Sequence, residues 1–529
     1  MSPELLGLSQ QVALGRGSRR DFLGRAAALG VSASVANMLL VNAAQAAGPV
    51  KGGIIKVGLV GGAATDSLDP AKFLAQAQFH FGRAWGEELV RLTPSGELDP
   101  RLATEWGSSP DAKVWTFKIR KGVQFHNGKE MTPDDVVAMI ERHSGPEAKS
   151  GALGILRGIE SVKRNGDTVV FTLKQANADL PYLLTDYHLL VQPNGGKDAP
   201  SAGIGTGPYK MAANEPGVRH IGSRFANYWA PNVRGFADQA EFLILNDSTA
   251  RTAALQSGRV NMINRLDPKV VDLIKRVPGI SIQNTPGRGH YVFVAHCNAS
   301  PFDNNDLRMA LKLAVNRVEM VDKILRGFGS VGNDFPINAG YPLFSSDVEQ
   351  RTYDPEKASF HYKKSGHTGT VLLRTSEVAF PGAVDAAQLF QTSCAKAGIK
   401  VEVKREPGDG YWTEVWNKQP FSASYWGGLA TQDQQYSTAY ISGADWNDTR
   451  FFNPKFDQLV VAARAELNSA KRKAMYRDMA VMVRDDGGVI VPMFNDTVDA
   501  IGPKVGGFVK NVNGELADGM AASESWLEA

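Results

Sequence analysis

The sequence predicts an α/β protein with more than one domain, and three observations support this fold class. The chain has 529 residues, too many for a single ordinary hydrophobic core. Hydrophobic residues make up 43% and charged residues 21%, which is the composition of a globular protein and not of a disordered or membrane-spanning one. Residues 370–426 read strand, helix, strand, helix, strand, the order typical of an open parallel sheet.

The first 46 residues have the order of an export signal. The basic stretch SRRDFLGR at 18–25 precedes a weakly apolar run at 26–41 and a small-x-small site that ends at Ala46. The apolar run is shorter and more polar than a membrane span requires. The arginine pair followed by Phe-Leu resembles the twin-arginine signal, with Gly24 where that motif usually has a basic residue. We therefore expect export to the periplasm and cleavage near Ala46.

The next elements predict an antiparallel sheet with attached helices. Residues 52–60 form the first predicted strand, and apolar and polar residues alternate over 113–119 and 167–174, as in half-buried strands. Between these two, Thr132 is followed by Pro-Asp-Asp, which supplies a helix N-cap, a proline at the first helical position and acidic first-turn residues. Two consecutive helices are predicted over 304–329.

Polar side chains follow the predicted strands of the segment 370–440. Its strands and helices are expected at 370–376, 381–398, 399–406, 409–418 and 421–426. Ligands of open α/β sheets lie beyond the carboxyl ends of the strands. We therefore expect Arg374 to Glu377, and a polar loop from Trp426 to Tyr436, to face a ligand.

The sequence contains no motif of a nucleophilic, metal-dependent or nucleotide-binding site. GxSxG, HExxH, CxxC and P-loop patterns are absent, and GIGTGPYK at 203–210 lacks the spacing of a dinucleotide fingerprint and predicts a tight turn. His290 and His296 are expected about 20 Å apart on one strand and cannot share a metal. Cys297 and Cys394 are expected to be separate thiols. We predict no catalytic residue, metal or cofactor, and the net charge of +3 does not favour nucleic-acid binding.

Seven segments, in order along nearly the whole mature chain, carry a family resemblance. They are DSLDPA (66–71), WTFKIRKGVQFHNGKEMTPDDVV (115–137), GTGPYK (205–210), RTAALQSGRVNMI (251–263), PFDNNDLRMALKLAVNRVEMV (301–321), AGIKVEV (397–403) and FDQLVVAARAELNSAKRKAMYRDMAVMV (456–483). They resemble the extracytoplasmic solute-binding proteins of family 5, the peptide, opine and nickel class that serves ABC importers. The resemblance implies a monomeric binding protein, not an enzyme, whose partners are a small-molecule solute and an ABC permease in the inner membrane.

The resemblance also implies the two-lobe fold of periplasmic binding proteins, with an extra subdomain in the first lobe. A hinge lets such lobes close on a ligand at their interface. The expected division is a signal peptide at 1–46, a lobe I core of 47–89 with 205–285 and 495–529, an inserted subdomain at 90–204, and lobe II at 286–494.

Eight residues are predicted to contact the ligand. Peptide-binding members of the family carry an aspartate three residues after the tryptophan that corresponds to Trp426, where it pairs with the amino terminus of the peptide. Leu429 stands at that position here, and Asp433 is the candidate substitute. The predicted contacts are Trp426, Asp433, Gln434, Tyr436, Arg374, Tyr187, His188 and Asp66.

Seven of these eight residues also have a structural alternative. Trp426 and His188 fit a packed core as well as a ligand contact. A surface ion pair is the alternative for Arg374, and a turn cap is the alternative for Asp66. The polar residues that follow Trp426 also fit a solvated loop.

The predicted function is delivery of a small solute to an ABC importer, the solute being an opine-like or amino-acid-derived compound or a short peptide. A metal–chelate complex held through its carboxylates is the alternative within the family, since the sparse histidines do not favour free nickel. A cofactor-bearing periplasmic enzyme is the second alternative, because twin-arginine export often carries proteins that load a cofactor first.

Overall fold

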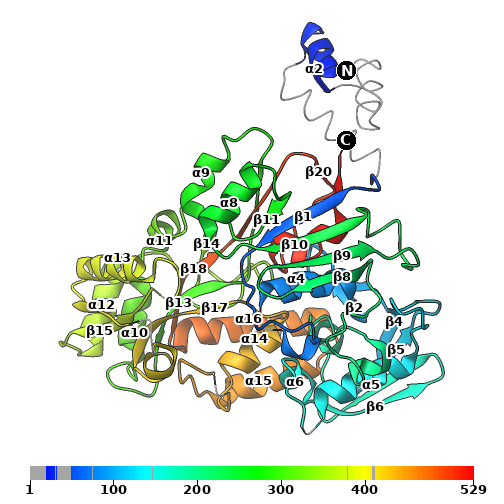
Figure 1. Cartoon of the computed structure of the whole chain (residues 1–529). Coiled ribbons are helices and arrows are strands. Elements are labelled where there is room, and N and C mark those ends of the chain that lie inside the picture. Colours follow the sequence, from blue (N-terminus) through cyan, green and yellow to red (C-terminus); the bar gives the residue numbers. More distant parts are fainter. Residues whose placement is uncertain are drawn as a thin grey trace.

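The computed structural model of the chain describes residues 19–29, 31 and 49–528, apart from 74, 146, 378, 408–410 and 445 (Figure 1). Within the first 46 residues, helix α2 (Arg19–Ala28) is the main described element. The predicted cleavage site and most of the apolar run lie outside the described residues. Among the described helices, none combines the length and apolar character of a membrane span.

Seven strands from distant parts of the sequence form the first sheet, in the order β12-β19-β11-β1-β10-β9-β8. The central strand β1 runs parallel to β10 and β11, and the other pairs are antiparallel. Helix α4 (Gln76–Trp85) packs Phe81 and Trp85 on one face of the sheet, and helix α8 (Ser248–Gln256) packs on the other. The strands are β1 (Ile54–Leu59), β8 (Tyr209–Glu215), β9 (Arg219–Arg224), β10 (Gln239–Ile244), β11 (Met262–Ile263), β12 (Ser281–Thr285) and β19 (Thr497–Ile501).

A smaller antiparallel sheet, β4-β5-β7-β6, forms a subdomain beside the first sheet. Its helix α5 (Pro133–Ser144) begins as predicted, because the Asp135 carboxylate accepts hydrogen bonds from the backbone N–H and the hydroxyl of Thr132, at 2.8 and 2.9 Å. The antiparallel sheet with an attached helix is therefore confirmed. The other elements are β2 (Val90–Leu92), β3 (Leu98–Pro100), β4 (Ala103–Ser108), β5 (Val114–Ile119), α6 (Leu153–Leu156), β6 (Ile159–Asn165), β7 (Thr168–Leu173) and α7 (Leu180–Leu183).

The tight turn predicted at 203–210 packs against the end of helix α4. A Cβ atom at Gly205 would lie 2.5 Å from the carbonyl oxygen of Trp85, and one at Gly207 would lie 2.6 Å from the carbonyl carbon of the same residue. Glycine alone lets two backbones approach so closely. The two glycines therefore have a packing role.

The second sheet has the order β14-β18-β13-β17-β15-β16. β15 is parallel to both β16 and β17, which confirms the parallel arrangement predicted for 370–426, whereas β13 is antiparallel to β17 and β18. The two helices predicted over 304–329 are also confirmed. The elements are β13 (His290–Ala295), α10 (Asn305–Leu313), α11 (Arg317–Lys323), β14 (Gly329–Val331), α12 (Pro355–Ser365), β15 (Val371–Thr375), α13 (Ala383–Lys396), β16 (Val401–Arg405), β17 (Phe421–Trp426) and β18 (Val489–Asn495).

Two local predictions in this half of the chain are wrong. The helix expected over 409–418 is a short π-helical turn, Tyr411–Val415. The polar loop expected up to Tyr436 gives way to helix α14 (Gln432–Ala439), because the Thr431 hydroxyl accepts a hydrogen bond from the N–H of Gln434 and caps the first turn.

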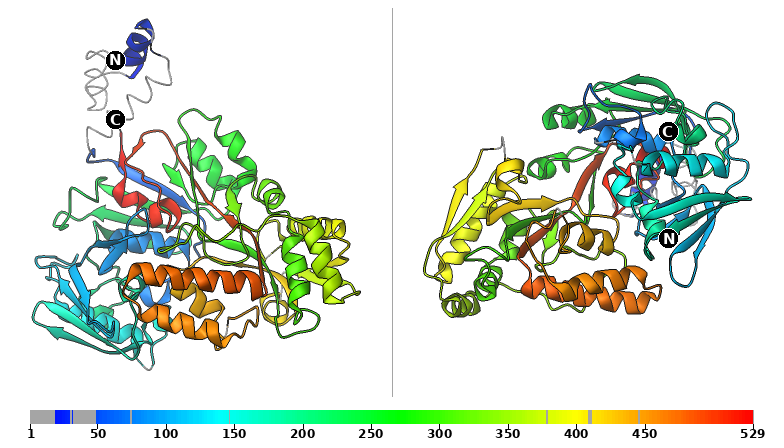
Figure 2. Two further views of the ribbon diagram at one scale, coloured as in Figure 1. Left: turned by 180° about the vertical axis from the view of Figure 1, so that it is seen from behind. Right: turned by 90° about the horizontal axis from the view of Figure 1, so that it is seen from below.

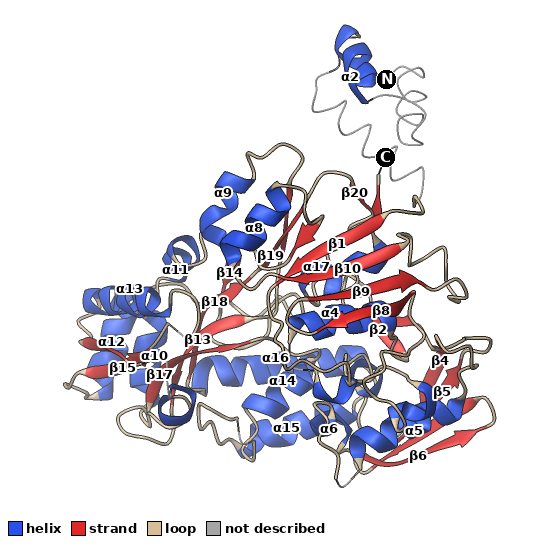
Figure 3. Cartoon of the chain, in the orientation of Figure 1, coloured by secondary structure: helices blue, strands red, loops and turns tan. Residues whose placement is uncertain are grey.

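The chain passes between the two large sheets twice, from β12 to β13 and from β18 to β19. Helices α15 (Pro454–Ala465) and α16 (Ser469–Asp486) run from the second sheet to the antiparallel subdomain. In Figure 2 the two helices are orange and the subdomain is cyan. There the N–H of Ala178 donates to the carbonyl of Arg464 at 2.8 Å, and Asp179 pairs with Arg472 at 2.7 Å. Figure 3 shows helices covering both sheets, as expected for an α/β protein.

Candidate functional site

Three aromatic residues gather at the end of the second sheet. Tyr291 of β13 pairs across the ladder with Tyr425 of β17, and its ring stacks on Phe380 with the centroids 4.3 Å apart and the planes 5° apart. Tyr425 is 49% exposed, Tyr291 is half-buried and Phe380 is buried. We call these three residues the aromatic group. They offer flat apolar faces together with two hydroxyl groups.

A cation from the first sheet lies close to the aromatic group. Arg265 follows β11, is 54% exposed and pairs with the Glu515 carboxylate. Burial raises the pKa of Tyr291 to about 12, and the positive charge of Arg265 opposes this rise. Burial lowers the pKa of His80 to about 3, and Arg265 adds to this effect. Charges act on pKa values over a range of about 10 Å, so Arg265 lies within electrostatic range of both His80 and Tyr291.

The backbone that carries Arg265 is held in a left-handed conformation. Arg265 has φ 46°, and Leu516 has φ 45°. The Asp499 side chain accepts hydrogen bonds from both of their N–H groups, at 3.3 and 2.6 Å. Burial raises the pKa of Asp499 to about 8, and the neighbouring Glu515 charge contributes. Backbone conformations of this kind persist where the surroundings enforce them and are concentrated at binding sites.

His80 supplies an uncharged imidazole beside Arg265. It lies on helix α4, where it is buried, and its low pKa keeps the ring neutral at physiological pH. Its Nε2 has no hydrogen-bond partner in the part of the chain that the structure describes. The adjacent Phe79 packs edge-on against Tyr187 at 5.1 Å. This side of the junction therefore combines a cation, a neutral polar group and aromatic rings.

Trp426 is next to Tyr425 in the chain but faces the other side of the sheet. It is 7% exposed and belongs to the core beneath α14, α15 and α16. Its indole and that of Trp416 lie against Asp448, whose pKa burial raises to about 7 while the two indoles oppose the rise. The predicted contact of Trp426 with a ligand stays a prediction, and in the structure Trp426 packs in the core.

The polar residues predicted after Trp426 are bound within the second half of the chain. The Nε of Arg464 donates to both carboxylate oxygens of Asp433, each at 3.1 Å. The side-chain oxygen of Gln434 accepts a hydrogen bond from the N–H of Ala430. Tyr436 is fully buried against Phe456 and Tyr440. A ligand ammonium group at Asp433 would therefore compete with Arg464.

The remaining predicted residues also have partners. Arg374 pairs with Glu406, at a half-buried position on β15. The Asp66 carboxylate accepts a hydrogen bond from the N–H of Ala63 at 3.0 Å and so caps a turn. Tyr187 is half-buried, and its ring stacks on His188 with the centroids 4.2 Å apart. Of the eight predicted contact residues, Tyr187 is the one that packs against Phe79, the neighbour of His80 in α4.

His188 is held by both of its ring nitrogens. Nδ1 lies 2.6 Å from the Asp186 carboxylate, and Nε2 lies 2.9 Å from the Phe73 carbonyl. Burial works to lower the pKa of His188, but the hydrogen bond with Asp186, the charge of Asp186 and the Phe73 carbonyl together outweigh it, and the pKa is raised. The ring therefore positions Tyr187 against α4 and has no nitrogen left for a ligand.

Sequence reasoning did not find Tyr425, Tyr291 or Arg265. Tyr425 and Trp426 are successive residues of one strand and therefore face opposite sides of the sheet. The pattern FSASYW indicates that one of them faces the junction but does not decide which. Arg265 had no signal of its own, because its left-handed backbone depends on Asp499, which is far away in the sequence.

The described residues contain no group of three His, Cys, Asp or Glu side chains placed to hold a metal. Cys297 and Cys394 are both free thiols, so the bridge that an oxidising compartment would permit is not formed.

Comparison with known proteins places the chain in a family. The profile of the bacterial extracellular solute-binding proteins, family 5 (middle region), matches residues 97–448. The dipeptide-binding protein of Escherichia coli (strain K12) is 25% identical over 453 residues, which cover 78% of this chain and 84% of that protein.

Two solved structures share the whole fold. The periplasmic binding protein DppA of Helicobacter pylori, in complex with the peptide STSA, aligns with a TM-score of 0.74 at 22% identity, over 91% of this chain and 99% of the other. AgaA of A. tumefaciens R10, in complex with agropinic acid, aligns with a TM-score of 0.73 at 24% identity, over 90% and 99%. The fold is therefore that of a two-lobe periplasmic binding protein. The chain belongs to the bacterial extracellular solute-binding proteins of family 5, which bind solutes and deliver them to ABC importers.

Proposed function

We propose that this protein binds an amphipathic carboxylate, an amino-acid-derived or opine-like compound or a short peptide, between its two lobes. The observation that carries the proposal is an exposed guanidinium, that of Arg265, within electrostatic range of Tyr291 and His80, at the end of the sheet where Tyr291 stacks on Phe380. An exposed guanidinium fits a carboxylate, and stacked rings fit the flat or apolar body of such a molecule. The names of the relatives include a dipeptide, the peptide STSA and agropinic acid, all of which carry carboxylates.

We propose that the domains have the bounds expected from the sequence. Lobe I comprises 47–89, 205–285 and 495–529, with the inserted subdomain at 90–204, and lobe II is 286–494. The protein acts as a monomer, without turnover, and the solute stabilises the closed arrangement of the lobes.

Mass spectrometry of small molecules released by denaturing the purified protein tests the proposal. We expect a carboxylate-bearing compound, and calorimetric titration of that compound into the refolded protein should give one-to-one binding that Arg265→Gln weakens about tenfold or more. A released molecule without an acidic group, or unchanged binding by Arg265→Gln, would contradict the proposal.

We further propose that export uses the twin-arginine route. Replacing Arg19-Arg20 with Lys-Lys should then stop export of the folded protein, as measured by the amount of protein in the periplasmic fraction. Normal amounts there would show that the signal is of another type.

A further inference from the structure

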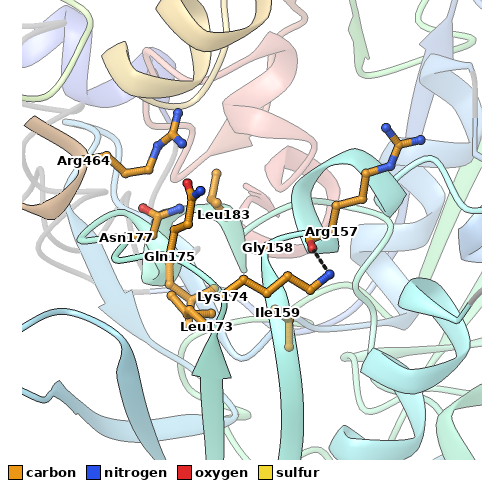
Figure 4. Close-up of a pocket in the computed structure, with 10 residues that line it drawn as sticks. Arg157, Gly158, Ile159, Leu173, Lys174, Gln175, Asn177, Leu183 and Arg464 are labelled. Carbon is orange, nitrogen blue, oxygen red and sulfur yellow. Dashed lines mark hydrogen bonds between the residues drawn. The ribbon is translucent and has the colours of Figure 1, made fainter. Parts of the chain in front are cut away.

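A pocket of about 300 Å³ lies where the antiparallel subdomain meets helix α15 (Figure 4). Nine of its ten lining residues belong to the segments 157–159 and 173–183, and the tenth is Arg464 of α15. Arg464 of α15 therefore completes a pocket that the antiparallel subdomain otherwise lines alone. None of its lining residues belongs to the aromatic group or to the surroundings of Arg265.

The lining combines an apolar wall with a cationic rim. Leu173 and Leu180 are buried, and Ile159 and Leu183 are half-buried beside them. Arg157, Lys174 and Arg464 supply positive charges, Gln175 and Asn177 supply amides, and the lining contains no acidic residue. Pockets for small ligands have this composition, mostly apolar with a few polar groups that fix orientation.

Two of the three cationic groups are held in place by hydrogen bonds. The Nε of Arg464 donates to Asp433, and its Nη2 donates to the hydroxyl of Ser437 at 2.6 Å. Its Nη1 has no hydrogen bond in the described part of the chain. On the other side, the Nζ of Lys174 donates to the carbonyl of Arg157 at 2.9 Å, as the dashed line in Figure 4 shows.

The net charge at the rim is positive. Asp433 offsets the charge of Arg464, but neither Arg157 nor Lys174 has an acidic partner within 4 Å among the described residues. A carboxylate at the rim would therefore gain charge-assisted hydrogen bonds without displacing an existing ion pair.

We propose that this pocket binds a small organic anion with an apolar body, such as a medium-chain carboxylate, at a site separate from that of the transported solute. The carboxylate lies at Lys174, and the body lies against the leucine wall between Lys174 and Arg464. Such an occupant contacts both lobes and so stabilises the arrangement in which they meet.

Calorimetric titration of the purified protein with octanoate, octan-1-ol and acetate tests this site. Octanoate supplies both the anion and the apolar body, octanol lacks the charge, and acetate lacks the body. We expect octanoate to bind one-to-one and at least tenfold more tightly than either of the others. Absence of octanoate binding, or equal binding of octanol, would overturn the proposal.

Charge-reversal variants locate the binding. Lys174→Glu should weaken octanoate binding at least tenfold, and Lys174→Met should weaken this binding by a smaller factor. Lys163→Glu, on strand β6 of the same sheet but outside the lining, should leave it unchanged. Circular dichroism confirms folding of each variant. Equal octanoate affinity in the parent and in Lys174→Glu would overturn the proposal.

One more variant separates this site from the proposed solute site. Tyr425→Ala alters the aromatic group and should leave octanoate binding unchanged. Loss of octanoate binding in this variant would show that octanoate enters the solute site, and the second site would then be refuted while the proposed function would stand.

Discussion

At the scale of single residues, Tyr425 and Trp426 are neighbours with opposite surroundings, and two substitutions separate their roles. Trp426→Ala removes a large side chain from the core and should lower the free energy of unfolding by about 3–5 kcal/mol. Tyr425→Ala removes a side chain that is 49% exposed and should change that energy by less than about 1 kcal/mol. It should weaken binding of the solute about tenfold, because the solute loses a ring on which to stack.

Urea denaturation and calorimetric titration of both variants check these expectations. If Tyr425→Ala binds the solute like the parent, the aromatic group is not the contact surface. If Trp426→Ala keeps its stability and loses binding, the role predicted from the sequence is the correct one.

Asp499 should make stability depend on pH in a direction that is unusual for a carboxylate. Its pKa is about 8 in the folded protein and about 3.8 when exposed, so the folded state holds more protons between these values. The free energy of unfolding contributed by this group therefore falls as the pH rises from about 4 to about 8, by up to about 1.4 kcal/mol per pH unit. Asp499→Asn removes this titration, so the free energy of unfolding of the variant should rise relative to that of the parent as the pH rises.

Urea denaturation of the parent and of Asp499→Asn at pH 5, 6.5 and 8 measures the difference. Asp322→Asn, at an exposed position of α11, is the matched control, and its free energy of unfolding should depend on pH as that of the parent does. A constant difference between the parent and Asp499→Asn across this range would show that Asp499 titrates normally.

At the scale of elements, the carboxyl end of α16 depends on one buried ammonium group. The Nζ of Lys312 donates to the carbonyls of Arg484, Gly487 and Val483, at 2.8, 2.7 and 3.4 Å. Lys312→Met leaves these buried acceptors without a donor and should cost about 2–4 kcal/mol in the free energy of unfolding. Lys323→Met, at an exposed position of α11, should cost less than about 0.5 kcal/mol. Equal denaturation midpoints for the two variants would contradict this role.

Elements whose signals are local could be predicted from the sequence. The TPDD stretch predicted the start of α5 because its capping groups lie within four residues of each other. The alternation of β5 and β7 predicted their burial for the same reason. Helix α14 was missed because its polar residues are buried through distant partners, such as Arg464 for Asp433. The site at the junction was missed for the same reason, since only the tertiary fold brings Arg265 within electrostatic range of Tyr291.

At the scale of the whole molecule, two polar contacts join the antiparallel subdomain to helices α15 and α16. One is the hydrogen bond from Ala178 to the Arg464 carbonyl, and the other is the buried ion pair of Asp179 and Arg472. Both lie away from the two segments that link the large sheets. A contact at this distance from a hinge opposes opening, because the lobes cannot separate without breaking it.

The ion pair of Asp179 and Arg472 should therefore shift the balance between open and closed lobes. Both side chains are buried, and removing one partner of a buried pair costs about 3–5 kcal/mol in the arrangement that buries the other. In the open arrangement water solvates Asp179, so Arg472→Met should favour opening and weaken the solute at least tenfold. Small-angle scattering of the solute-free variant should show a larger radius of gyration than that of the parent. Arg477→Met, on the same helix but paired with the exposed Asp347, is the control and should leave both quantities unchanged. An unchanged radius together with unchanged affinity in Arg472→Met would show that the pair contributes only to folding, and that closure depends on the solute alone.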